Sequence, residues 1–100
     1  MIESFPTEVD HTVRLKRAKM RAWRRGMREM DLILGGFIDK NGPALTVEQL
    51  DAFELLLAHK DQDLFDWVSG RKPVADDVAT TGQAALISEM RGSWRDIDEN

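Results

Sequence analysis

A run of apolar residues at helical spacing dominates the middle of the chain. Its members recur every three or four residues: Met27, Met30, Ile33, Leu34, Phe37 and Ile38. This spacing places them on one broad face of a helix, which we expect to be buried. Alternation of apolar and polar residues, which predicts strands, is weak because the β-branched residues are scattered. The sequence therefore predicts an all-α fold built around a helix over residues 27–39.

Capping signals place two further helices beside the central one. The first is expected to run from an Asp10 cap to about Arg24 and to be mostly solvated. Its thin apolar stripe comprises Val13, Lys16 or Arg17, Met20 and Trp23. Another helix is expected over residues 46–59, because Thr46 and Gln49 fit a capping box at its start. Its apolar face comprises Val47, Leu50, Phe53, Leu56 and Leu57.

The last two helices are expected after short loops. A short helix capped by Asp61 or Asp63 should end at Gly70, because glycine readily terminates helices. A fifth helix should begin near Asp76 or Thr80. Its apolar face comprises Leu86, Ile87, Met90 and Trp94. Five short helices with short connections predict a compact five-helix bundle.

The length of 100 residues predicts a single domain with one modest core. We expect a flexible N-terminal arm over 1–9, the helical bundle over 10–95 and a frayed C-terminal tail over 96–100. No apolar run approaches the roughly 18 residues that span a bilayer, so no membrane partner is expected. The arm is acidic, the reverse of a targeting peptide. This favours a bacterial cytoplasmic location, with a processed mitochondrial matrix form as the alternative.

The titratable residues offer little for catalysis. The chain has no cysteine, and His11 and His59 lie far apart near helix ends, which argues against a zinc site. Carboxylate pairs such as Asp61 and Asp63 lie where helix caps and first-turn acids belong. The glycines match neither a phosphate-binding loop nor a dinucleotide fingerprint. We therefore expect no catalytic residue, no metal site and no tightly bound cofactor.

Positive charge is concentrated in one segment. Residues 11–28 carry a formal charge of +8, whereas residues 29–100 carry −9. Nucleic-acid binding would use these cations with Trp23 stacked on a base, but the acidic remainder would repel a polyanion. A membrane-surface helix needs bulkier apolar residues. Docking onto an acidic partner protein fits better. The alternative is a small nucleic-acid-binding or regulatory module that uses the basic helix over 14–28.

Gly26 interrupts the helical pattern inside this basic segment. A glycine in a helix costs roughly 1 kcal/mol relative to alanine, so its presence indicates a positive φ or the close approach of another surface. Glu29 follows in the first turn of the next helix, where it either binds a partner or pairs with Arg25. Trp67 lies on the shoulder of an apolar face and is a candidate interface anchor.

Two segments together resemble the SdhE family of small assembly factors for the succinate dehydrogenase flavoprotein subunit. They are RRGMREMDLILGGFID at 24–39 and DQDLFDWV at 61–68. The Arg-Gly-x-x-Glu signature of that family is present at residues 25–29, and the order and separation of the two segments match as well. The resemblance extends from about Leu15 to Trp67.

The resemblance implies a five-helix assembly factor that is not an enzyme. Such a factor binds the immature flavoprotein subunit of succinate dehydrogenase, and often that of fumarate reductase, and promotes covalent attachment of FAD to a partner histidine. It holds no FAD tightly itself, and no nucleic-acid partner is expected. The expected partner-binding residues are Arg24, Arg25, Gly26, Met27, Arg28, Glu29, Asp31 and Trp67.

Overall fold

The computed structural model describes the backbone of residues 7–99 and the side chains of residues 11–92. Every secondary-structure element in this part of the chain is a helix. In order, the elements are α1 (Thr7–Ala22), α2 (Arg28–Asn41), the 3-10 helix η2 (Gly42–Ala44), α3 (Val47–Leu57), α4 (Asp61–Ser69), α5 (Asp76–Ala79) and α6 (Gln83–Glu99). The predicted all-α class is therefore confirmed.

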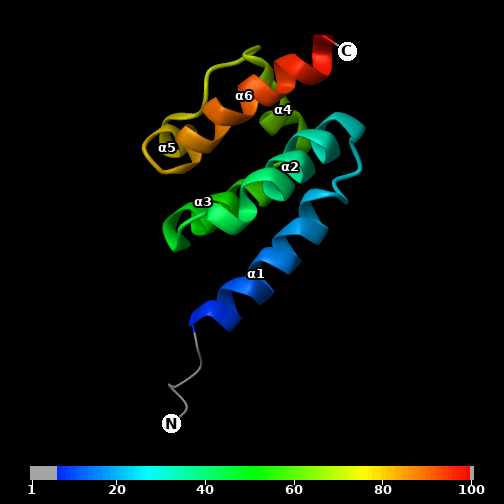
Figure 1. The fold of residues 1–100 in the computed structure, drawn as a ribbon. Coiled ribbons are helices and arrows are strands. Elements are labelled where there is room, and N and C mark those ends of the chain that lie inside the picture. Colours follow the sequence, from blue (N-terminus) through cyan, green and yellow to red (C-terminus); the bar gives the residue numbers. More distant parts are fainter. Residues whose placement is uncertain (1–6, 100) are drawn as a thin grey trace.

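Helix α2 occupies the centre of the bundle (Figure 1). Helix α1 packs against α2 in the opposite direction and also contacts α3, whereas α4 and α6 contact α2 from its other side. The connection between α1 and α2 forms a turn at one end of this helix pair (Figure 1). The arrangement leaves this turn and the outer side of α1 at the surface.

The number of helices differs from the expected five, because the described residues form six α-helices. The predicted fifth helix is divided into α5 and α6 by the residues between Ala79 and Gln83. Within this break, the Thr81 hydroxyl donates to the Val78 carbonyl at 2.8 Å and accepts from the Gln83 N–H at 3.2 Å. A threonine side chain that bonds to nearby backbone competes with the helical pattern, and glycine at position 82 weakens it further.

The core forms around the predicted face of α2. Five of its residues are buried: Met30, Ile33, Leu34, Phe37 and Ile38. Met27, the sixth residue of that face, is half-buried at the N-cap and packs against the core. The Phe37 ring stacks on Phe53 of α3, with ring centroids 5.8 Å apart. The sequence pattern thus identified the central helix and its buried face correctly.

The predicted apolar stripe of α1 is wrong. Of the expected stripe, Trp23 alone packs inward in part, because its indole lies against Gly35 although the residue is 37% exposed. Val13 and Met20 are 44% and 55% exposed, and Ala18 and Ala22 are buried in their place. These small side chains let the α1 backbone lie close to its neighbours, so the helix needs no large apolar residue at the contact. Arg14, one turn before Ala18 on α1, donates hydrogen bonds to Glu54 and Asp51 of α3. Both carboxylates raise the pKa of Arg14, and Glu54 has the larger effect. The Arg14 guanidinium thus joins α1 to α3 through two ion pairs.

The ends of the domain also differ from expectation. Helix α1 begins at Thr7, so Asp10 lies in its first turn and residues 7–9 are helical, whereas the rest of the expected arm, residues 1–6, lies outside the described residues. Helix α6 continues to Glu99, through most of the segment expected to be frayed. The side chain of Trp94 lies outside the described residues.

Caps at α3 and α4 were predicted in part. The capping box is confirmed, because Thr46 Oγ1 accepts from the Gln49 N–H at 3.1 Å and the Gln49 side chain accepts from the Thr46 N–H at 2.9 Å. Val47, expected on the buried face, is 43% exposed. Helix α4 ends at Gly70 with φ +83°, as predicted, but its N-cap is Lys60 and not an aspartate.

The adjacent glycines of α2 provide a test of the packing of Trp23. A Cβ at Gly35 would overlap the Trp23 indole, whereas a Cβ at Gly36 would meet no atom within 4 Å. Gly36→Ala should therefore raise the free energy of unfolding by about 0.5–1 kcal/mol through helix propensity. Gly35→Ala should lower it by about 1 kcal/mol because the indole is displaced. Urea unfolding measures both, and equal stabilisation by the two substitutions would show that Trp23 does not pack on Gly35.

Candidate functional site

The turn between α1 and α2 is built around Gly26, whose backbone conformation only glycine adopts without strain. The N–H groups of Trp23 and Arg24 bond to the carbonyls of Lys19 and Arg21, which continues the turn of α1 past its end. Gly26 then has φ +96°, and the chain enters α2 through an extended Met27. The predicted positive φ is confirmed. A Cβ at Gly26 would meet no atom within 4 Å, so the glycine is required by backbone conformation and not by crowding within the protein.

Asp31 fixes the shape of this turn from within α2. Its Oδ1 accepts a hydrogen bond from the backbone N–H of Arg25 at 2.7 Å, and its own N–H donates to the Met27 carbonyl at 2.9 Å. The side chain is half-buried. Asp31 therefore has a clear role inside the protein, as the residue that ties the turn to the first turn of α2.

The Arg25 side chain is committed to internal contacts. Its Nε donates to Asp61 Oδ1 at 2.7 Å, and Nη1 and Nη2 donate to the carbonyls of Leu57 and His59 at 2.5 and 2.6 Å. These carbonyls lie at the C-terminal end of α3, where helical carbonyls lack intrahelical partners and a cation is favoured. The side chain is only 12% exposed. Arg25 thus joins the turn to α3 and α4, a structural role that the sequence did not predict for this expected partner-binding residue.

Trp67 also lies inside the protein. It is 8% exposed, and its ring meets the half-buried His59 ring edge-on with centroids 5.1 Å apart. The His59 Nε2 forms a hydrogen bond with the buried Gln83 at 2.9 Å. The Trp67 carbonyl accepts from the Arg91 guanidinium of α6. These contacts place Trp67 in the core between α4 and α6. The side chain is therefore not accessible at the surface, as an interface anchor would be.

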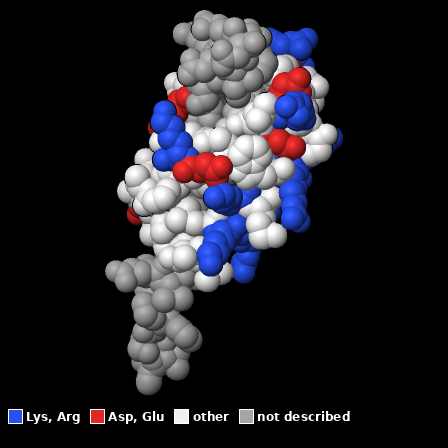
Figure 2. Space-filling view, turned by 45° about the vertical axis from the view of Figure 1, so that its right-hand side comes forward, with Lys and Arg blue, Asp and Glu red and all other residues white. Residues whose placement is uncertain are grey.

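Four of the expected partner-binding residues are exposed on the turn and the start of α2: Arg24, Gly26, Arg28 and Glu29. We refer to these four residues as the Gly26 surface. Within residues 11–92, Glu29 forms no ion pair. Its alternative role, pairing with Arg25, is taken by Asp61. Met27 is half-buried beneath this surface. Figure 2 shows several Lys and Arg side chains over the lower right part of the face in view, and Asp and Glu side chains lie between the cations in its upper part.

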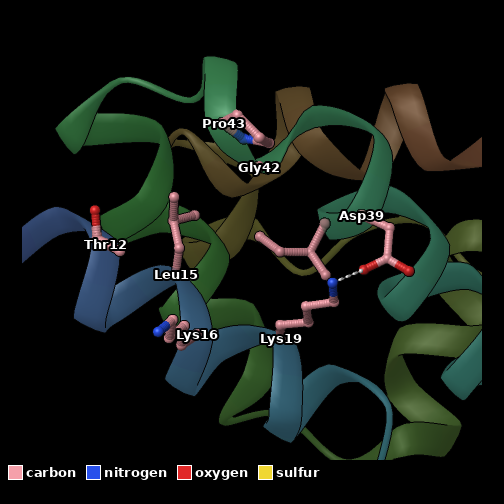
Figure 3. Close-up of a pocket in the computed structure, with 8 residues that line it drawn as sticks. Thr12, Leu15, Lys16, Lys19, Asp39, Gly42 and Pro43 are labelled. Carbon is pink, nitrogen blue, oxygen red and sulfur yellow. Dashed lines mark ion pairs between the residues drawn. The ribbon is translucent and has the colours of Figure 1, made fainter.

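A separate recess of about 190 Å³ lies between α1 and the end of α2 (Figure 3). Leu15, Lys16 and Lys19 line it from one side, and Asp39 and Pro43 from the other. The Lys19 ammonium pairs with the Asp39 carboxylate at 3.1 Å across this recess. Across the described part of the chain, no group of three His, Cys, Asp or Glu side chains could hold a metal ion. None of the described helices is long and apolar enough to cross a membrane.

Comparison with known families finds one match over most of the chain. The family is Sdh5, described as the flavinator of succinate dehydrogenase, and it matches residues 16–92. This range includes both segments that carry the sequence resemblance and extends beyond them through α5 and into α6. The match therefore covers the whole Gly26 surface and the helices that support it. No solved structure matches the chain.

Individual relatives come from bacteria and from a eukaryote. The FAD assembly factor SdhE of Acetobacter pasteurianus is 36% identical over 78 residues, which cover 78% of this chain and 72% of that protein. The FAD assembly factor SdhE of Legionella pneumophila is 47% identical over 49 residues, covering 49% of this chain and 62% of the relative. The mitochondrial succinate dehydrogenase assembly factor 2 of Dictyostelium discoideum is 41% identical over 56 residues, covering 56% and 40% of the two chains.

Proposed function

The chain belongs to the Sdh5 family, the flavinators of succinate dehydrogenase, and we propose that it uses the Gly26 surface to bind the flavoprotein subunit of that enzyme. Bound there, it promotes covalent attachment of FAD to the subunit. As a member of this family the protein is an assembly factor and not an enzyme. The observation that carries the proposed site is an exposed Gly26 at φ +96° beside a Glu29 that has no ion pair in the described part of the chain.

The internal contacts of Arg25 and Asp31 support this proposal by making the surface rigid. Arg25 ties the turn to α3 and α4 through three hydrogen bonds, and Asp31 holds its backbone. A surface that is ordered before binding loses less conformational entropy when a partner docks. Gly26 has no side chain, so a partner backbone can approach the turn closely. The arrangement suits recognition of one defined surface.

The role that fits this chain is to hold the partner and not to supply reacting groups. The bond between flavin and protein forms within the partner, and its rate depends on how well the reacting groups are positioned. The Gly26 surface offers Glu29 as an acceptor and Arg24 and Arg28 as donors, which can hold a partner loop or domain in one arrangement. We place the FAD in the partner, because the glycine spacing of this chain includes no phosphate-binding loop.

Two flavoproteins are candidate partners. The primary partner is the succinate dehydrogenase flavoprotein, and the fumarate reductase flavoprotein is a second candidate. We propose a bacterial cytoplasmic location, which agrees with the bacterial origin of the relatives from Acetobacter and Legionella. No nucleic-acid partner is proposed.

Replacing Glu29 tests the proposed site. Glu29→Ala should weaken binding of the flavoprotein subunit about tenfold or more, because a charge-assisted hydrogen bond contributes roughly 1.5–3 kcal/mol. In-gel flavin fluorescence of the captured subunit should fall when Glu29→Ala is the only copy of the factor. The matched control is Glu48→Ala, which removes another exposed acid from the first turn of a helix, α3. Equal capture and flavinylation by wild type and Glu29→Ala would exclude Glu29 from the contact.

A further inference from the structure

The cations between residues 14 and 28 fall into two groups according to whether they pair within the protein. Arg14 pairs with Asp51 and Glu54, Lys19 pairs with Asp39, and Arg25 pairs with Asp61. The other five form no ion pair within residues 11–92: Lys16, Arg17, Arg21, Arg24 and Arg28. The first group joins helices within the protein, whereas the second group is exposed and has no acid paired with it in the described part of the chain.

Three of the unpaired arginines lie along α1 and the turn that directly follows it. Arg17, Arg21 and Arg24 follow one another at intervals of four and three residues, which places them along one side of a helix. The Arg24 N–H donates to the Arg21 carbonyl at 3.3 Å, so the helical turn continues past the end of α1. Arg24 also belongs to the Gly26 surface. The cationic face therefore runs without interruption from the middle of α1 to the proposed partner contact.

A large apolar side chain lies among these arginines. Met20 is 55% exposed, with Arg17 one turn before it in α1 and Arg24 in the turn that follows the helix. It lines a shallow recess of about 330 Å³ together with Arg21, Arg24 and Arg25. Because Ala18 and Ala22 make the contact with the core, Met20 has no packing role in the described fold. A flexible thioether at the centre of a cationic face is suited to an apolar group on a protein partner.

We propose that this face, the α1 face (Arg17, Met20, Arg21 and Arg24), binds an acidic segment of the partner flavoprotein in which an apolar side chain accompanies the carboxylates. The inference rests on the proposed function and extends its contact along α1. Arginines form paired hydrogen bonds with carboxylates, while Met20 covers the apolar side chain. Nucleic-acid phosphates would engage the same cations but would leave Met20 in water, and residues 29–100, with a formal charge of −9, would repel them.

The contribution of the arginine charges to partner binding is measured by the association rate. The purified, FAD-loaded flavoprotein subunit is mixed with variants of this protein. Arg17→Glu and Arg21→Glu should each slow association about tenfold at low ionic strength, because charges at a contact steer the encounter. The difference should shrink as salt is added. Lys40→Glu is the matched control, since it makes the same charge change at an exposed position on α2. Circular dichroism confirms that each variant is folded.

The contribution of the apolar Met20 side chain to partner binding is measured by the rate at which the complex with the flavoprotein dissociates. Met20→Gln should speed dissociation about fivefold, whereas Leu55→Gln on α3, a position 53% exposed, should not change it. If Glu29→Ala weakens binding but the α1 variants do not, the proposed function stands and the α1 face is excluded. If the wild-type protein does not bind the flavoprotein, the proposed function fails. If a DNA oligonucleotide binds near physiological ionic strength and Arg17→Glu abolishes this, the face is a nucleic-acid site and the inference is overturned.

Discussion

Replacing Arg25 by alanine is expected to lower the free energy of unfolding by about 3 kcal/mol, the scale for breaking a largely buried ion pair with its hydrogen bonds. The substitution removes the donors to Asp61 and to the carbonyls of Leu57 and His59. It leaves the end of α3 without its cation and the partly buried Asp61 without its ion pair. The turn, α3 and the start of α4 would lose their common connection. In a domain of this size the melting temperature should fall by about 12–24 °C.

Urea unfolding followed by circular dichroism measures this effect, and Arg24→Ala is the matched control. Arg24 is the neighbouring arginine, but it is exposed and has no ion pair in the described part of the chain. Its removal should change stability by less than about 0.5 kcal/mol, yet it should weaken partner binding. Arg25→Lys should recover little stability, because an ammonium cannot reach three separate acceptors in a fork. If Arg25→Ala melts like the wild type and loses only partner binding, Arg25 is a contact residue, as the sequence had suggested.

The central helices were predictable because their buried residues are large. On α2 and α3, bulky apolar residues recur at helical spacing, so the buried face is visible in the sequence itself. Helix α1 buries Ala18 and Ala22 and exposes Met20. Hydrophobicity favours the larger side chain, but close helix contact favours the smaller one. A pattern based on apolar size therefore assigned the wrong face of α1 to the core.

The candidate site was predictable only where it depends on local conformation. The positive φ of Gly26 follows from one residue and its neighbours. The contacts of Arg25 are made with Leu57, His59 and Asp61, which are more than 30 positions away in the sequence. No local pattern identifies such acceptors, and the two carbonyls are backbone groups without a sequence signal. The packing of Trp23 on Gly35 was also missed, although a glycine inside a strongly helical pattern is a signal for a close contact.

Gly26→Arg is expected to abolish detectable binding of the flavoprotein subunit while the protein remains folded. The arginine would project from the centre of the Gly26 surface and hold the partner backbone away. The substitution should also cost some stability, because Gly26 has a φ of +96°. An L-residue in the left-handed region costs about 1–2 kcal/mol, so the melting temperature should fall by roughly 4–16 °C. Calorimetry and a pull-down of the subunit measure the two effects.

Gly70→Arg separates the loss of binding from the loss of stability. Gly70 has φ +83° and, like Gly26, a Cβ added there would meet no atom within 4 Å, so the two substitutions impose similar backbone strain. Gly70 lies at the end of α4, outside the Gly26 surface, and its variant should therefore bind the partner normally. D-alanine at position 26, introduced by chemical synthesis, favours a positive φ and adds only a methyl group, so it should preserve stability and test steric exclusion alone. If Gly70→Arg loses binding to the same extent as Gly26→Arg, reduced stability accounts for the loss, and Gly26 is a structural residue with no part in the contact.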